Sequence, residues 1–382
     1  MELFDVYPLY PIEPVKAEGH FLWDSEGNQY MDFYGGHAVI SIGHGHPHYK
    51  KRITEQLDKI AFYSNSVVNP LQQELAQKLG KLSGYEDYQL FLCSSGAEAN
   101  ENALKLASFH SGKDRVIAFE KGFHGRTSGA VAVTDNKKYV SPFNQHHKVS
   151  ILEMNNSQLV EDELKKGDVG AVIIEGIQGL AGIYMASQEF MSDLRELCSK
   201  YDTPLILDEV QSGYGRSGKF FAHQHFGIKP DIITVAKGMG NGFPVAGVLI
   251  SPEFKPWYGM LGTTFGGNHL AAAAALAVLE VIEDENLIQN ASEMEAVQKK
   301  HFANIPSVKE IRGKGLMTAI EFGFPIKELR AKLLMDEKVF TGTSMNPNVL
   351  RLLPPLGVKE NDIQQFTTKL IKVLEDETVH FS

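Results

Sequence analysis

The strongest constraint on the fold is an alternation of short apolar runs with helical stretches between residues 46 and 275. We predict that the apolar runs are strands: QLFLCSS, DRVIAFE, GAVAVT, GAVIIEGI, TPLILDEV, PDIITVA and VAGVLIS. Between several of them lie stretches typical of helices, such as AEANENALKLASFH and SQEFMSDLRELCSK. This alternation indicates an α/β fold with a mostly parallel sheet that is covered on both faces. Function is then expected at the carboxyl ends of the strands.

The rest of the chain predicts two further parts. Residues 1–45 are rich in Pro, Gly and Tyr and are expected to form an arm with short strands. An Ala-rich helical stretch begins near residue 270, and a mixture of strand and helix patterns follows it, ending in an amphipathic helix. We therefore expect a large α/β domain over residues 46–275 and a smaller α+β domain over residues 276–382.

Composition excludes several classes of protein. The net charge of −10 disfavours a nucleic acid or an anionic membrane as a partner. The two cysteines, Cys93 and Cys198, lie far apart and predict neither a disulfide scaffold nor a metal site. The start of the chain lacks a signal peptide, and the longest apolar stretch, residues 270–279, is about half of a membrane span. These features predict a soluble, cytoplasmic protein.

Two charged residues follow apolar strands in the richest part of the sequence. Asp208 ends TPLILD, and Lys237 follows IITVA. Desolvation at the rim of a sheet lowers the pKa of a lysine and makes its neutral amine a usable nucleophile. The glycines at 238, 240 and 242 let a flat ligand approach the backbone. The pair fits pyridoxal phosphate, with Lys237 for a Schiff base and Asp208 for the pyridine nitrogen.

Such a cofactor also needs a phosphate site. The segment CSSGAEANENALK places Ser95, Gly96 and Ala97 between a strand and a helix, with Ser95 and Glu98 spaced as a capping box. Free N–H groups at that helix start can hold a phosphate dianion. A second candidate is Thr263-Thr264 in GTTFGGN, where hydroxyl groups and glycines meet.

The ordered motifs SGAEANENALK, FHGRT, LDEVQSGYGRSG, ITVAKGMGNGFP and GTTFGGN resemble those of class III aminotransferases of the fold-type-I pyridoxal-phosphate family. WDSEGNQYMDFYGG and ISIGHGHP resemble the entry segment of that family, so the resemblance covers nearly the whole chain. Within the family, the chain is most similar to N-acetylornithine and N-succinylornithine aminotransferases of arginine biosynthesis.

The resemblance implies roles for individual residues. Lys237 would form the Schiff base and move the proton, and Asp208 would lie under the pyridine nitrogen. Arg126 would bind a distal substrate carboxylate, and Arg351 would bind the α-carboxylate of glutamate or 2-oxoglutarate. Thr263 would be a further substrate-binding residue. The remaining cofactor contacts would be Ser95, Gly96, Ala97, Phe123, Glu209, Val210, Gln211 and, from a second subunit, Thr264.

The function implied by the resemblance is transfer of the δ-amino group of an N-acylornithine to 2-oxoglutarate by a homodimer. Two alternatives stay open: another ω-amine transaminase, acting on ornithine, 4-aminobutyrate or a diamine, and an aminomutase or racemase on the same fold. A non-enzymatic binding protein would leave the coincidence of Lys237 and Asp208 without a reason.

Four residues depart from the pattern of the family: His269 replaces a common Pro, Leu261 replaces a common His, and the other two bear on the substrates. Leu180, in EGIQGLAG, replaces an acid that pairs with the counterpart of Arg351. We therefore expect Arg351 to be solvated or paired with another acid, and glutamate to be handled well. His37, in GGHAV, stands where the acetylornithine group has an apolar residue. A histidine could help to neutralise a succinyl carboxylate, which predicts that succinylornithine is at least as good a substrate as acetylornithine.

Two further motifs are weak. The glycines at 213, 215 and 218 match G-x-G-x-x-G but do not directly follow a strand, so we do not expect nucleotide binding. His44, His46 and His48 alternate before and after Pro47 in a way that suits a turn, and we expect no metal there.

Overall fold

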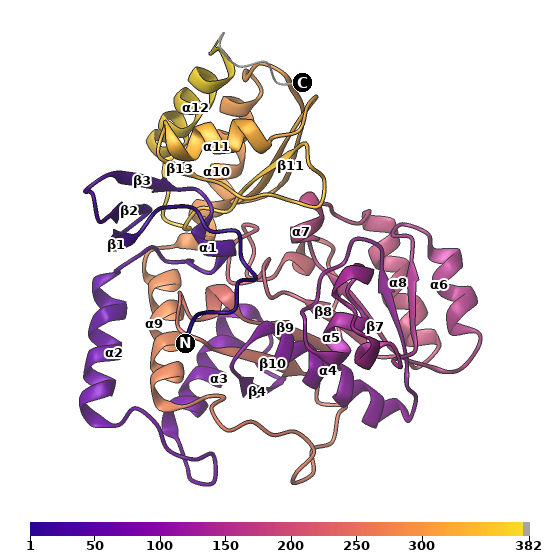
Figure 1. Cartoon of the computed structure of the whole chain (residues 1–382). Helices are drawn as coiled ribbons and strands as arrows, with labels where there is room; N and C mark the ends of the chain where they lie inside the picture. The colour runs from indigo at the N-terminus through magenta and orange to yellow at the C-terminus, as the bar shows by residue number, and fades with distance from the viewer. Residues whose placement is uncertain (377–382) are drawn as a thin grey trace.

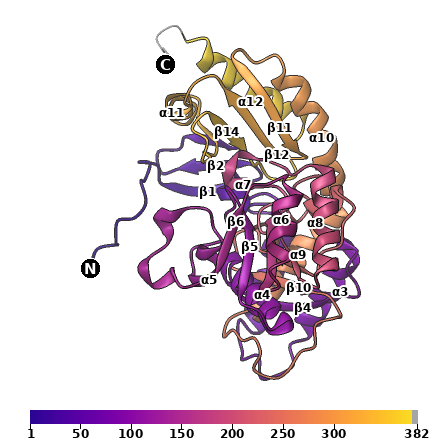
Figure 2. The ribbon, with the colours of Figure 1, turned by 90° about the vertical axis from the view of Figure 1, so that its right-hand side faces the viewer.

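The computed structural model describes residues 1–376 and shows a large α/β body with a smaller part above it (Figure 1). Its strands form three sheets, of seven, four and three strands. The first residues of the chain extend away from the large body, as the second view shows (Figure 2). Within residues 1–376, no helix combines the length and the apolar character needed to cross a membrane.

A seven-stranded sheet forms the centre of the large body. Its strands, in chain order, are β4 (Gln89–Cys93), β5 (Arg115–Phe119), β6 (Val149–Leu152), β7 (Val169–Glu175), β8 (Leu205–Asp208), β9 (Ile232–Val235) and β10 (Ala246–Ile250). Across the sheet the order is β4-β10-β9-β8-β7-β5-β6. β10 is antiparallel to both of its neighbours, and the pairs from β9 to β6 are parallel. The predicted mostly parallel sheet is confirmed.

Side chains of β8 show why both faces of this sheet must be covered. Leu205 and Leu207 belong to a buried cluster with α8 (Gln188–Lys200), beside which α6 (Ser157–Leu164) packs. Ile206, between them, belongs to a different cluster that includes residues of α4 (Gly96–Ser111). Successive side chains of a strand point to opposite faces, so a strand that is apolar throughout requires helices on both.

The remaining helices of the large body complete this cover. α9 (His269–Asp284), the predicted Ala-rich helix, packs against α2 (Pro47–Lys59) and α3 (Pro70–Ser83). Shorter elements are α1 (Gly35–Ala38), α5 (Ser128–Ala132), α7 (Gly179–Gly182), η1 (Lys137–Tyr139), η2 (Pro142–Asn144), η3 (Ala222–His225) and η4 (Lys237–Met239).

Two small sheets accompany the C-terminal part. β11 (Val308–Lys314), β12 (Met317–Phe322) and β14 (Val349–Leu352) form one, in the company of α10 (Leu287–Phe302), α11 (Lys327–Met335) and α12 (Glu360–Leu374). The other contains β1 (Pro14–Glu18), β2 (Phe21–Asp24), β3 (Gln29–Asp32) and β13 (Val339–Phe340), and β3 is parallel to β13. The N-terminal strands thus share a sheet with the C-terminal part. The predicted domain boundaries after residues 45 and 275 remain our proposal. The last six residues of the proposed C-terminal domain, 377–382, lie outside the described chain.

One predicted strand is wrong. The run GAVAVT contains most of α5, not a strand. Glu101 of α4 accepts hydrogen bonds from Thr127 Oγ1 (2.6 Å) and from the backbone N–H of Ala130 (3.0 Å), and it thereby satisfies donors at the start of this helix. A short apolar run cannot be distinguished from a buried helical turn by periodicity alone. Conversely, β6 was not among the predicted strands.

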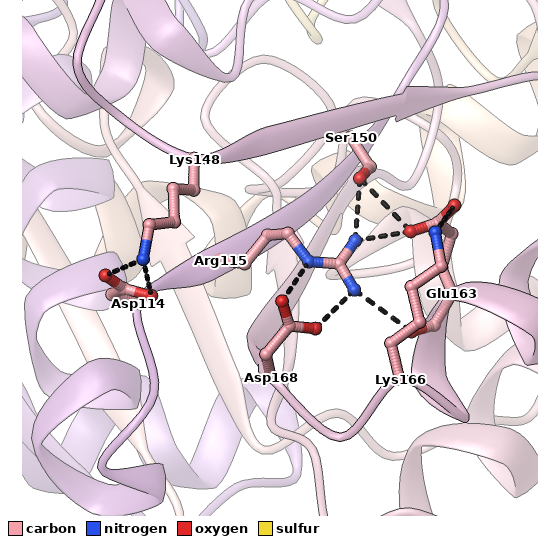
Figure 3. A network of polar contacts seen from close by, with 7 residues as sticks. All are labelled: Asp114, Arg115, Lys148, Ser150, Glu163, Lys166 and Asp168. Carbon is pink, nitrogen blue, oxygen red and sulfur yellow. Dashed lines mark hydrogen bonds and ion pairs between the residues drawn. The ribbon is translucent and has the colours of Figure 1, made fainter.

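A polar network joins the amino ends of β5 and β6 to α6 (Figure 3). The Arg115 side chain is 11% exposed and donates to both carboxylate oxygens of Asp168, at 3.0 and 2.5 Å. It also donates to Ser150 Oγ (2.7 Å) and to Glu163. The neighbouring pair of Lys148 and Asp114 is mostly exposed to solvent. Arg115 therefore holds three segments together, and Lys148 does not.

We expect Arg115→Ala to lower the thermal unfolding midpoint by several degrees, because Asp168 and Glu163 lose charge-assisted hydrogen bonds. Lys148→Ala is the control and should change the midpoint by about one degree or less, since exposed ion pairs contribute little. Both variants are compared with the wild type by thermal denaturation at one protein and cofactor concentration. Equal shifts for the two variants would contradict this assignment.

Candidate active site

A cavity of about 580 Å³ opens at the carboxyl ends of β7, β8 and β9, as the α/β fold predicted. Glu175 and Asp208 end neighbouring parallel strands and are register partners. Above them, α1 contacts η4 and α7 contacts β14, so the cavity lies where the large body meets the C-terminal part. Of the predicted site residues, those that line the cavity are Ser95, Gly96, Ala97, Phe123, Arg126, Asp208, Val210, Gln211, Lys237 and Arg351.

Lys237 follows β9 and begins η4 in the left-handed region, with φ of 47°. A non-glycine residue in this conformation is strained, and such strain is found most often at functional sites. Desolvation lowers the pKa of the Lys237 ammonium, although Asp208 and Glu175 oppose the shift. Among the hydrogen bonds and ion pairs of residues 1–376, none involves the side-chain amine. Lys237 therefore presents a free amine of weakened basicity to the cavity.

Asp208, in contrast, is held firmly. Its Oδ2 accepts hydrogen bonds from His124 Nδ1 and Asn100 Nδ2, both at 2.8 Å, and its Oδ1 accepts from the backbone N–H of Val210. Asn100 is oriented in turn by Thr234, whose hydroxyl donates to Asn100 Oδ1 (2.7 Å). With these donors on one carboxylate, its position and orientation are fixed before any ligand binds.

The start of α4 lines the cavity. The backbone N–H of Glu98 donates to Ser95 Oγ (3.2 Å), as the capping box predicted, but the Glu98 carboxylate accepts from Ser94 N–H instead of Ser95 N–H. Among the hydrogen bonds of the described chain, the N–H groups of Ser95, Gly96 and Ala97 have no protein acceptor. A Cβ on Gly96 would lie 2.7 Å from Val210 Cγ1. The site therefore offers three free donors at a helix start and requires glycine there.

Arg351, on β14, is 1% exposed and reaches the cavity from the C-terminal part. Its guanidinium donates to the carbonyl oxygens of Thr343 and Gly179 and, at 3.4 Å, to Gln211 Oε1. No carboxylate of residues 1–376 forms an ion pair with it, and Leu180 lines the wall beside it. Arg351 was expected to be solvated or paired with another acid, but it is buried and bonded to carbonyl and amide oxygens instead. The effect on glutamate remains a prediction.

Arg126 and Phe123 come from the loop after β5. Arg126 is exposed, and its guanidinium lies 4.2 Å from the ring centroid of Tyr139. Phe123 is half-buried, and its backbone N–H donates to Glu175 Oε1 (2.9 Å). The stacking leaves the hydrogen-bonding edge of Arg126 available to an anion in the cavity.

Three predicted residues do not line the cavity. Glu209 was predicted to contact the cofactor, but its carboxylate is fully buried behind β8 and accepts from His223, Ser212 and Ala222. Its acceptor capacity is used within the protein, which corrects that prediction. Thr263 and Thr264 lie in a surface loop, and Thr264 is exposed. Neither threonine contributes to the cavity of its own chain.

Glu175 lines the cavity and, like Asn100 and His124, was not among the site residues predicted from the sequence. Its carboxylate accepts from the backbone N–H groups of Phe123 and Gly179. Desolvation, with a smaller contribution from the charge of Asp208, raises its pKa to about 7, against the influence of His124. The signal was present in the sequence, because Glu175 ends the apolar run GAVIIE as Asp208 ends PLILD.

The two weak motifs have structural explanations. His44, His46 and His48 each bond to a different carboxylate, of Asp32, Glu285 and Glu280. No group of three or more potential metal ligands occurs in residues 1–376. The glycine at 218 packs against α10, where a Cβ would lie 3.0 Å from Ser292 Cα, so close packing accounts for it.

Glu175 makes the stability of the protein depend on pH. Between its ordinary pKa of 4.5 and its folded value of about 7, the folded state keeps a proton that the unfolded state releases. This contribution to stability therefore falls as pH rises through that window, by up to about 3 kcal/mol. We expect Glu175→Gln to gain stability relative to the wild type between pH 5 and pH 8 in urea denaturation. A difference that stays constant with pH would contradict this.

Comparison with known proteins agrees with the site. The family described as Aminotransferase class-III matches residues 6–374. The chain is 40% identical to the acetylornithine aminotransferase of Bacillus subtilis, over 96% of each chain. The structure is similar to that of the acetylornithine aminotransferase of Elizabethkingia anophelis, with a TM-score of 0.83 and 30% identity over 97% of this chain and 95% of the other. It is also similar to an ornithine aminotransferase of Toxoplasma gondii, with a TM-score of 0.87 and 27% identity over 97% and 91% of the chains.

The Toxoplasma enzyme holds pyridoxal phosphate at partial occupancy in its active site. In the present chain, a free lysine amine, a fixed aspartate and three unused N–H donors surround one cavity. The expected fold, family and enzyme class are confirmed, and the cofactor is pyridoxal phosphate. The chain belongs to the class-III aminotransferases.

Proposed function

We propose that this enzyme transfers the δ-amino group of an N-acylornithine to 2-oxoglutarate, giving the N-acylglutamate semialdehyde and glutamate, as in arginine biosynthesis. The observation that supports it most is that Lys237, Asp208, Arg126 and Arg351 line the same cavity. The names of the relatives favour acetylornithine as a substrate. That succinylornithine is at least as good a substrate as acetylornithine, which His37 suggested, stays a prediction.

The residues present fit pyridoxal phosphate. Lys237 would hold it covalently, and the N–H groups of Ser95, Gly96 and Ala97 would bind its phosphate. Asp208 would pair with the ring nitrogen, and Gln211 would bond the ring hydroxyl. Phe123 and Val210 would cover the ring.

The chemistry of the bound cofactor is to accept electrons when the α-proton of the attached substrate leaves. The chain supplies what this step requires. Asp208, oriented by His124 and Asn100, would keep the ring nitrogen protonated. The lowered pKa of Lys237 makes its neutral amine available to take up and return the proton. Leu180 and Phe243 are among the apolar side chains that line the cavity.

The two arginines give the cavity two anion sites. A planar guanidinium binds a carboxylate with two parallel hydrogen bonds. Arg351 would bind the α-carboxylate of glutamate or 2-oxoglutarate, and Arg126 would bind a distal carboxylate. The alternatives, ornithine or 4-aminobutyrate transamination and mutase or racemase chemistry, use the same cofactor site and differ in which substrates react.

We also propose that the enzyme works as a homodimer in the cytoplasm. Thr264 is exposed, next to Phe265, and the Phe265 ring packs against that of Phe62, 5.5 Å between centroids. Large apolar side chains stay exposed around this loop, namely Tyr63, Val68, Trp257 and Tyr258. A second copy that covered this surface would bury them and could bring Thr264 to its neighbour's phosphate.

The half-reactions test the proposed function. Loss of the cofactor absorbance of the holoenzyme is followed after mixing with acetylornithine, succinylornithine, ornithine, 4-aminobutyrate or glutamate. We expect glutamate and at least one acylornithine to react, and Lys237→Ala to react more than about 10³-fold more slowly, because the proton carrier is lost. Reaction without any need for 2-oxoglutarate to restore the cofactor would indicate a mutase. Borohydride reduction and peptide mapping should label Lys237, and a label elsewhere would overturn the site.

The phosphate site predicts the effect of a single methyl group. Gly96→Ala should weaken binding of pyridoxal phosphate by about tenfold or more, because the new Cβ meets Val210 and displaces the N–H donors. The matched control is Gly357→Ala, since a Cβ there has no atom within 4 Å. Both affinities are measured by titrating the cofactor-free protein. An unchanged affinity of the Gly96 variant would show that the phosphate binds elsewhere.

A further inference from the structure

A strained backbone segment presents His37 to the cavity. Gly35, Gly36, His37 and Ala38 are all left-handed, with φ of 55°, 54°, 68° and 65°. Such a conformation disfavours residues with a Cβ by about 1–2 kcal/mol each. The turn is held by Asp32, which accepts from the N–H of Gly35 (2.8 Å), and by hydrogen bonds to its own backbone. A strained conformation at a ligand cavity is maintained by its surroundings and indicates a functional constraint.

The side chain of His37 is tied to Arg351 through Tyr34. His37 lines the cavity, and its Nδ1 shares a hydrogen bond with the Tyr34 hydroxyl. Tyr34 also lies beside Arg351, because a Cβ on Gly342 would meet both the Tyr34 ring and Arg351 Cβ, and the guanidinium acts on the pKa of the Tyr34 hydroxyl. Gln211 also connects the two residues, because its Nε2 donates to the His37 carbonyl (3.2 Å) and its Oε1 accepts from Arg351. An imidazole thus stands beside the arginine that lacks a carboxylate partner.

Three basic groups act on the charge of His37, namely Arg351 of β14, Lys237 of η4 and Arg330 of α11. Tyr34 is the one titratable group of the described chain hydrogen-bonded to its ring. In the holoenzyme the amine of Lys237 would be bound to the cofactor, so the two arginines would remain. Desolvation, followed by these three charges, lowers the pKa of His37. The ring is therefore neutral near pH 7. It accepts the Tyr34 proton at Nδ1 and carries its own proton on Nε2.

We propose that His37 takes up a proton when a substrate carboxylate binds Arg351, and so becomes a second cationic partner of that carboxylate. The proton comes from solvent and goes to Nδ1, whose N–H then donates to the Tyr34 oxygen, while the Tyr34 proton turns away from the ring. A bound carboxylate offsets the positive charge of Arg351 and favours the imidazolium.

This inference rests on the proposed function and explains how one cavity can serve two substrates. Glutamate and 2-oxoglutarate bring a carboxylate to Arg351, and His37 becomes charged. An N-acylornithine that reacts at its δ-amino group brings an apolar carbon to the same place, and His37 stays neutral. The charge of His37 then changes with the charge of the bound substrate. No acid at position 180 does this, because that residue is leucine.

Isothermal titration calorimetry of the holoenzyme with 2-oxoglutarate tests the proposal, because the oxo acid has no amine to transfer and only binds. Titrations at pH 7 in two buffers of different ionisation enthalpy give the number of protons taken up. We expect uptake of up to about one proton by the wild type. His37→Asn should abolish the uptake and weaken binding by about tenfold. Asparagine suits this position because it tolerates the left-handed conformation.

Two further variants complete the experiment. His48→Asn makes the same change at a histidine that bonds Glu280 outside the cavity, and its uptake should equal that of the wild type. Tyr34→Phe should weaken 2-oxoglutarate binding but keep the uptake, because Tyr34 only orients the ring. If the His37 variant does not fold, the pH dependence of 2-oxoglutarate binding by the wild type still tests the proposal. The affinity of the wild type for 2-oxoglutarate should fall as pH rises from 7 to 9.

No uptake by the wild type, an affinity independent of pH, or full uptake by His37→Asn would each overturn the proposal. Because the probe is a dicarboxylate alone, these outcomes do not depend on whether an acylornithine is the amine substrate. Failure of the half-reaction with acylornithines would overturn the proposed function and leave the proton uptake intact.

Discussion

The structure depends on the desolvation of ionisable side chains at the carboxyl edge of an otherwise apolar sheet. β7, β8 and β9 are buried along their length, and Glu175, Asp208 and Lys237 stand at or just beyond their ends. Low dielectric surroundings penalise each charge, so a group there is stable only when it is partnered or neutral. Asp208 is partnered by His124 and Asn100, whereas Lys237 and Glu175 shift toward their neutral forms.

The contrast between a partnered, charged Asp208 and a Lys237 that shifts toward its neutral form determines which cofactor chemistry the cavity can support. A fixed anion and a free amine on neighbouring strands suit a cofactor that needs one ring nitrogen protonated and one carbonyl carbon attacked. The same logic applies at the other wall. Arg351 is held by carbonyl and amide oxygens, which orient the guanidinium without neutralising it, so its charge remains available to a substrate anion.

Much of this could be predicted from sequence because local chemistry determines it. Apolar runs that end in Asp208 or precede Lys237 identified the sheet edge, and Ser95 and Gly96 identified the helix start that faces it. The failures have physical reasons. The run GAVAVT carries no periodicity that separates a strand from a buried turn of helix, and Glu101, which caps that helix, comes from α4. Glu209 follows Asp208 directly, yet its buried carboxylate bonds to His223 and Ser212 and does not line the cavity.

The sequence by itself determined most strands of the large sheet, the chemical nature of the groups at the strand ends and the absence of an acid at residue 180. Tertiary structure alone decided that Tyr34 and His37 of the N-terminal segment would meet Arg351 of β14, because β3 pairs with β13 and brings the two ends of the chain together. Contacts between segments about 300 residues apart depend on how the sheets assemble, and no local pattern encodes that assembly.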